Sequence, residues 1–138
     1  MGAGDQLLRR ALTDAETGLF NWISLRMETE RAVARAERYH FPLGLVVVHC
    51  HRCGPDEMTL VAGRLAGALR RSDLLARTGE RDLVLLLTHD DAENVHDVIE
   101  RLRRLGEEIR ATGVVPGLEL EIRAEVATDD YGRLLAHV

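Results

Sequence analysis

A short run of imidazole and thiol side chains near the middle of the chain could bind a metal. His49, His51 and Cys53 occupy alternate positions directly after a continuous apolar stretch. Successive side chains of a strand point to opposite faces, so a strand that continues through this run places all three on one side. Imidazole and thiolate are ligands that zinc prefers, and a tetrahedral site needs four. His89, at the end of a second expected strand, is the candidate fourth ligand.

The two cysteines allow another interpretation, a redox pair. Cys50 and Cys53 are separated by two residues and are followed by Gly54 and Pro55, where a helix is expected to begin. A helix N-terminus can activate the thiolate of such a pair. The expected order of strands and helices does not fit a thioredoxin fold, however. The remaining alternative is that these residues have no chemical role.

The elements that position these residues follow from hydrophobic periodicity. Apolar residues at helical spacing predict helices from Asn21 to about Tyr39, from near Asp56 to about Leu69, and from Ala92 to Arg110. Strands are expected at 43–48, 73–77, 82–87 and 118–126, with a tight turn at 78–81 between the second and third. A short helix is expected over residues 5–12 as a connector, followed by one domain over 13–138, and a last short helix begins near Asp130.

This order predicts a two-layer α/β sandwich with a mostly antiparallel central sheet flanked by helices, related to the ferredoxin-like pattern. The chain of 138 residues is long enough for one domain with a real core. Because aromatic residues make up only 4%, that core must be aliphatic.

Composition also excludes several classes of function. The formal net charge is −5, whereas a nucleic-acid-binding surface usually needs a basic excess. All 18 basic residues are arginine, which removes every reaction that needs a lysine amine. No apolar run approaches the length of a membrane span, and no signal peptide is visible. We therefore expect a cytoplasmic protein with no membrane span and no nucleic-acid partner.

Several stretches, taken in order, resemble the GGDEF domain, the bacterial module that makes cyclic di-GMP. Residues 14–21 (DAETGLFN) are similar to its D-x-L-T-G-L-x-N entry motif, and residues 69–79 (LRRSDLLARTG) are similar to the approach to its signature hairpin. The strand ending at Val126 and Ala127 is similar to its S-I-G-V-A strand. The similarity covers residues 13–137 and implies the nucleotidyl cyclase-like fold.

The resemblance also shows departures at the positions that matter for catalysis. The G-G-[DE]-E-F signature falls on Gly79-Glu80-Arg81-Asp82-Leu83, so Arg81 stands where active members have a metal-binding carboxylate. His49 stands at the position of the other metal ligand, an aspartate. The F-K-x-x-N-D-x-x-G-H stretch, which reads guanine and contacts phosphate, is absent. Mg²⁺ prefers oxygen ligands, so we expect a degenerate domain without cyclase activity.

One family feature is retained. Active cyclases often carry an R-x-x-D inhibitory site for their own product, and Arg70 and Asp73 fit that pattern. An arginine fork can bind guanine O6 and N7, and a carboxylate can accept hydrogen bonds from the guanine N1 and N2 edge. The alternative is an ordinary arginine near a helix C-terminus, paired with a nearby aspartate.

Three functional hypotheses follow. The first is an inactive signalling domain that acts through contact with a protein partner or with itself as a homodimer. The second is a cyclic di-GMP receptor that uses Arg70 and Asp73. The third is an altered metal-binding domain that uses His49, His51 and Cys53. Under the first hypothesis we expect no cofactor, with cyclic di-GMP the candidate ligand under the second.

Overall fold

The computed structural model describes residue 4 and residues 11–138. The expected connector helix lies outside this range except for Ala11 and Leu12, which are helical. The elements are β1 (Phe20–Asn21), α2 (Trp22–Tyr39), β2 (Leu43–His51), α3 (Pro55–Ala66), β3 (Leu74–Arg77), β4 (Asp82–Thr88), α4 (Ala92–Ala111), β5 (Glu119–Ala127) and the 3-10 helix η1 (Tyr131–His137). No helix among the described residues is long and apolar enough to cross a membrane.

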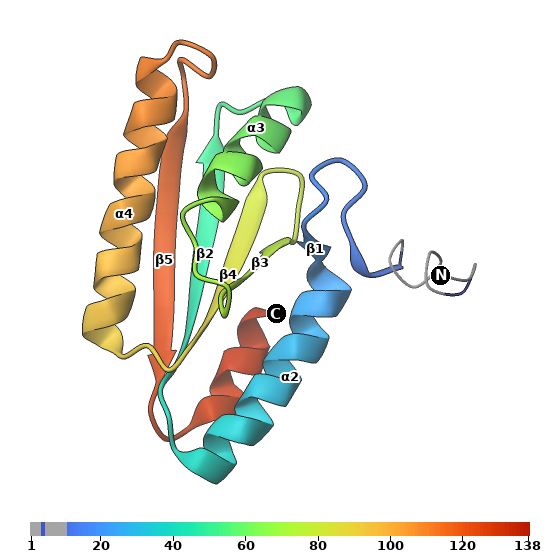
Figure 1. The fold of residues 1–138 in the computed structure, drawn as a ribbon, viewed down its shortest axis with the longest axis vertical. Coiled ribbons are helices and arrows are strands. Elements are labelled where there is room, and N and C mark those ends of the chain that lie inside the picture. Colours follow the sequence, from blue (N-terminus) through green and yellow to red (C-terminus); the bar gives the residue numbers. More distant parts are fainter. Residues whose placement is uncertain (1–3, 5–10) are drawn as a thin grey trace.

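The five strands form one sheet in the order β1-β3-β4-β2-β5 (Figure 1). The long strand β2 lies between β4 and β5 and pairs antiparallel with both, and β3 pairs antiparallel with β4. Only the two-residue strand β1 pairs parallel, with β3. The expected α/β sandwich with a mostly antiparallel sheet is therefore confirmed. The structure adds β1 and extends β2 by three residues beyond the expected end at Val48.

Helices cover both faces of the sheet, so the side chains of β2 contribute to two cores. Val46, Val48 and Cys50 belong to the cluster under α3 and α4. Leu43 and Leu45 belong to the cluster under α2 and η1. Figure 1 shows α2 and η1 side by side, away from α4. The stripe of α2 that recurs at helical spacing faces the second core, and its members are buried: Leu25, Thr29, Ala32, Val33 and Ala36.

The helix ends follow from local chemistry. Asn21 is the N-cap of α2, because its side-chain oxygen accepts a hydrogen bond from the Ser24 amide at 3.1 Å. The helix ends at His40, which adopts the left-handed conformation with φ 58°. The N-cap of α3 is Gly54, and Pro55 fixes the first turn. Only three residues, 52–54, therefore connect β2 to α3.

Candidate functional site

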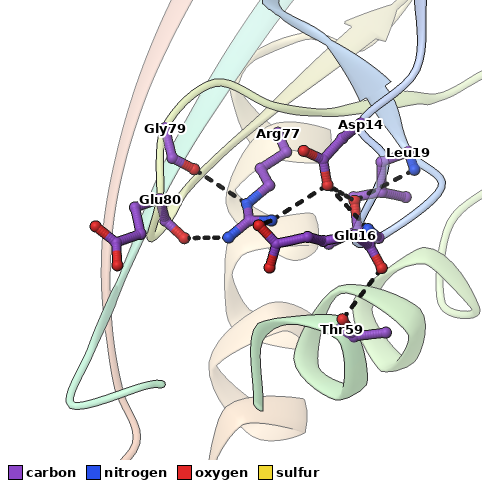
Figure 2. Close-up of polar contacts among 8 residues, drawn as sticks. Asp14, Glu16, Leu19, Thr59, Arg77, Gly79 and Glu80 are labelled. Carbon is purple, nitrogen blue, oxygen red and sulfur yellow. Dashed lines mark hydrogen bonds and ion pairs between the residues drawn. The ribbon is translucent and has the colours of Figure 1, made fainter. Parts of the chain in front are cut away.

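A buried arginine organises the hairpin between β3 and β4. The Arg77 side chain, at the end of β3, is only 5% exposed. Its Nε donates to the carbonyl of Gly79 at 3.2 Å, and its Nη2 donates to the carbonyl of Glu80 at 2.6 Å. Its Nη1 lies 3.2 Å from Asp14 Oδ2 and 3.4 Å from Glu16 Oε1 (Figure 2). One guanidinium thus holds the hairpin turn against the turn that precedes α2.

The preceding turn is built around Asp14. Its carboxylate accepts hydrogen bonds from the amide and the hydroxyl of Thr17, at 2.9 and 2.7 Å. Gly18, at φ 73°, adopts the left-handed conformation that glycine tolerates. Burial acts to raise the pKa of Asp14, but the two bonds from Thr17 and the Arg77 charge outweigh it, so this pKa lies below its ordinary value. The turn therefore places the ionised Asp14 carboxylate beside Arg77 at the hairpin.

The turn also contacts helix α3. The Thr59 hydroxyl donates to the backbone carbonyl of Glu16 at 3.2 Å, as Figure 2 shows. A shallow hollow of about 320 Å³ lies beside this contact. It is lined by Asp14, Glu16, Asn21, Trp22, Arg77, Thr78, Gly79 and Glu80. Three carboxylates and one already paired arginine give this hollow an acidic character, which is unfavourable for a phosphate group.

The end of β2 lies against the hairpin. His49 is directly opposite Asp82 in the sheet register, and His49 Nδ1 lies 2.5 Å from Asp82 Oδ1. Arg81 turns toward the other side, where its Nε donates to the carbonyl of Cys53 at 2.9 Å. The Arg81 carbonyl in turn accepts from the Cys50 amide at 2.8 Å. The Asp82 carboxylate is thus engaged by an imidazole, and its neighbour in the chain is a cation.

The predicted four-ligand metal site is wrong. Arg52 adopts φ 55°, which reverses the strand alternation, so Cys53 is buried in the core with Cys50 instead of lying beside His49. His89 lies at the far end of β4, where its ring stacks on Phe41 at 3.9 Å. Six residues of antiparallel strand, about 20 Å, separate that end from His49. Within the described part of the chain, no group of three or more His, Cys, Asp or Glu side chains is arranged to hold a metal.

The two thiols lack the environment of a redox pair. Both cysteines are free and buried. Burial, together with the charges of Cys53 and Asp82, raises the pKa of Cys50 to about 12. Burial also raises the pKa of Cys53, with a contribution from Glu57. A reactive thiolate needs a lowered pKa and access to solvent, and neither thiol has them.

The structure brings Arg70 and Asp73 together, and it adds a third residue that the sequence did not indicate. Arg70 Nη2 lies 3.2 Å from Asp73 Oδ1 and also bonds Asp90, from the end of β4. Asp73 also accepts from the Arg70 amide at 2.9 Å, and its side chain is 2% exposed. The hydrogen bond that Arg70 donates to the Asp73 carboxylate raises the pKa of Arg70 above its ordinary value. The guanidinium is half-exposed, whereas both carboxylates are buried.

Comparison with known proteins now decides the family. A family model described as "Diguanylate cyclase, GGDEF domain" matches residues 11–128. The chain belongs to the GGDEF domain family. This family places it among the domains of cyclic di-GMP signalling. A curated relative, the diguanylate cyclase DgcP of Pseudomonas aeruginosa, is 34% identical over 106 residues. That match covers 69% of this chain and 16% of DgcP, so the chain spans about a sixth of its length.

Solved GGDEF structures share this fold. The diguanylate cyclase SiaD of P. aeruginosa, solved in complex with its activator SiaC, superposes with a TM-score of 0.79 at 20% identity and covers 96% of this chain and 57% of SiaD. The GGDEF domain of FimX from P. aeruginosa superposes with a TM-score of 0.73 at 19% identity, and the match covers 86% of this chain and 82% of the FimX chain. The coiled coil and GGDEF domain of DgcB from Caulobacter crescentus were solved in complex with c-di-GMP. This structure superposes with a TM-score of 0.74 at 22% identity, and the match covers 93% of this chain and 74% of the DgcB chain.

Within this GGDEF domain, the signature positions occupy the β3–β4 hairpin as the sequence predicted. The turn runs through Gly79 and Glu80, and β4 begins at Asp82. Gly79 faces the Asp82 carboxylate closely, since a Cβ at Gly79 would lie 2.6 Å from Asp82 Oδ2. Because this oxygen is the far end of a side chain, a larger residue at position 79 would require the Asp82 carboxylate to move.

Proposed function

We propose that this GGDEF domain does not synthesise cyclic di-GMP and acts in cyclic di-GMP signalling through contact with another protein or with a second copy of itself. The observation that carries the proposal is the pairing at the metal position. His49 replaces the expected aspartate and is hydrogen-bonded to Asp82, while Arg81 replaces the expected carboxylate.

The residues at the metal position do not supply the negative charge that would hold the divalent ions of a cyclase reaction. Phosphoryl transfer depends on divalent ions that neutralise charge developing on the phosphate. Mg²⁺ requires oxygen ligands in near-octahedral geometry, and an imidazole with an adjacent guanidinium is a poor replacement for two carboxylates. The three-residue connection at 52–54 also leaves no segment for a base-reading loop.

A contact role is supported by exposed apolar side chains around the start of α2. Trp22 is 57% exposed, and Phe20, Ile23 and Met27 are between 38% and 44% exposed. Ile23 and Met27 are four residues apart and therefore share one side of the helix. Gathered apolar side chains on a surface mark contact sites more often than scattered ones do.

Two measurements test this proposal. Purified protein incubated with GTP and Mg²⁺ is expected to form no cyclic di-GMP, and measurable product would refute the inactive assignment. Sedimentation equilibrium is expected to show a concentration-dependent dimer that Ile23→Glu/Met27→Glu weakens. The matched control is Leu60→Glu on α3, since Leu60 is also 40% exposed but lies on another helix. A wild-type chain that remains monomeric would contradict self-association.

A second candidate function is that of a cyclic di-GMP receptor. Arg70 supports it, because its half-exposed guanidinium lines two hollows. One contains Leu19, Phe20, Leu69 and Leu75, which offer an apolar surface to a purine ring; the other contains Asp90, Asn94 and Arg101. The buried Asp73 would have to release Arg70 before accepting from guanine.

Calorimetric titration with cyclic di-GMP and with GTP distinguishes the two candidates. Under the receptor hypothesis, Arg70→Ala abolishes binding of cyclic di-GMP. Arg71→Ala, one residue later and exposed, leaves it unchanged. The absence of binding by the wild-type protein would eliminate the receptor role and leave the contact role.

A further inference from the structure

Two imidazole rings lie side by side at the end of β2. His49 and His51 both point to the sheet face that carries Leu45 and Val47, beyond the core under α2 and η1. Their ring centroids are 4.5 Å apart, and the rings meet edge to face at 71°. Their side chains are 37% and 43% exposed. Two rings this close and this accessible can present nitrogens to one ion.

Each ring is held by a carboxylate from a different neighbouring strand. Asp82, on β4, lies 2.5 Å from His49 Nδ1. Glu121, on β5, lies 3.3 Å from His51 Nε2. His49 is directly opposite both carboxylate residues in the sheet register, so the fold fixes this row of side chains. A row set by three paired strands is more rigid than one built on a loop.

The carboxylates determine which nitrogens remain available. A neutral imidazole that donates one N–H to a carboxylate has an unshared electron pair on the other ring nitrogen. Metal-binding histidines commonly have this arrangement, in which the carboxylate fixes the tautomer and raises the basicity of the ligand. His49 Nε2 and His51 Nδ1 have no hydrogen-bond partner within residues 11–138, so both are available.

We propose that His49 Nε2 and His51 Nδ1 bind one divalent transition ion of the zinc class. Imidazole suits Zn²⁺, Ni²⁺ and Cu²⁺, whereas Mg²⁺ prefers oxygen. The protein supplies two ligands, and water completes the coordination. Asp82 and Glu121 act as positioning residues that orient the rings. The buried thiol of Cys53 and the distant His89 take no part.

Equilibrium dialysis of the tag-free protein against ZnCl₂ tests this site. The wild-type chain is expected to bind one equivalent, and millimolar MgCl₂ should not compete. His49→Asn and His51→Asn should each weaken binding at least tenfold. His96→Asn provides the matched control, because His96 is exposed on α4, far along the chain from both rings. This control should bind as the wild type does.

The zinc affinity of Glu121→Gln tests whether Glu121 orients the His51 ring. Loss of a carboxylate behind a metal-binding histidine weakens binding about 10- to 100-fold, and this exposed position should tolerate the change without unfolding. Circular dichroism of each variant checks the fold. Zinc binding that is absent, or that survives loss of both histidines, would overturn the proposal. Zinc binding is measured without nucleotide and cyclic di-GMP formation is measured with Mg²⁺, so failure of this proposal and failure of the proposed function give different results.

Discussion

Replacement of Arg77 by methionine is expected to destabilise the domain strongly. The substitution removes the guanidinium that joins the hairpin carbonyls of Gly79 and Glu80 to the carboxylate of Asp14. Methionine retains most of the side-chain length, so the lost interactions are mainly polar. Because the Arg77 side chain is 5% exposed, water cannot readily replace it as the hydrogen-bond donor.

The magnitude follows from how deeply each partner is buried. Removing one member of a buried ion pair costs about 3–5 kcal/mol, because the other charge is left uncompensated. Asp14 is 23% exposed and Glu16 is 56% exposed, so solvent relieves part of this cost. We therefore expect a loss near the lower limit, about 3 kcal/mol in the free energy of unfolding. With a urea m-value of about 2 kcal/mol per molar, the midpoint falls by about 1.5 M.

The effect should also depend on pH, through Asp14. Its folded pKa lies below the ordinary value of 3.8, so its ionised form contributes stability above that value, and this contribution is lost as pH falls through the folded pKa. Part of the lowering of the Asp14 pKa comes from the Arg77 hydrogen bond and charge. The difference between wild type and Arg77→Met should therefore shrink as the pH is lowered below 3.8.

Urea unfolding followed by far-ultraviolet circular dichroism measures these differences. Arg71→Met is the control, because Arg71 is exposed and has no hydrogen bond within the described residues; its effect should stay below about 0.5 kcal/mol. A double-mutant cycle with Asp14→Asn should give a coupling energy of about 1–2 kcal/mol. A loss below about 1 kcal/mol for Arg77→Met at neutral pH would refute this account of the hairpin.

Further predictions concern packing and thiol reactivity. Gly106→Ala should destabilise the domain by about 1–2 kcal/mol, since its Cβ would lie 2.8 Å from Leu120 Cδ1. Gly63→Ala should stabilise it by about 0.5–1 kcal/mol, because open space surrounds that helical position; urea midpoints of both variants check the signs. Cys50 and Cys53 should resist iodoacetamide in the folded protein and react after unfolding, as mass spectrometry would show. Rapid alkylation of native protein would contradict their burial.

The fold was predictable because its elements carry strong local patterns. Helix α2 begins at a capping residue, Asn21, and its buried stripe recurs at helical spacing. In β5 the charged residues Glu119, Glu121 and Arg123 alternate with apolar ones and are exposed, but the alternation ends there, because Ala124 is exposed and Glu125 is partly buried. The parallel pairing of Phe20 with Ala76 was not predictable, because two residues carry no periodic signal.

The site was less predictable, since it depends on backbone conformation and on distant pairing. Arg52 adopts a positive φ that its residue type does not favour, and this reverses the direction of Cys53. The contact between Arg77 and Asp14 joins residues 63 positions apart. No spacing rule predicts such a pair, although residues 14–21 were similar to the family's entry motif. The position of His89 was deducible, because antiparallel pairing places the end of β4 beside the start of β2.

The central claim is that cyclase activity is lost at several places at once. Cyclic di-GMP formation from GTP and Mg²⁺ tests it most directly, measured by chromatography for the wild type and for His49→Asp/Arg81→Glu, which restores both carboxylates. An active GGDEF domain serves as the positive control. Neither protein is expected to form product, because on the proposed account the three-residue connection at 52–54 leaves no room for a base-reading stretch. Product from the wild type would contradict the loss of activity, and product from the double variant alone would confine that loss to the metal ligands.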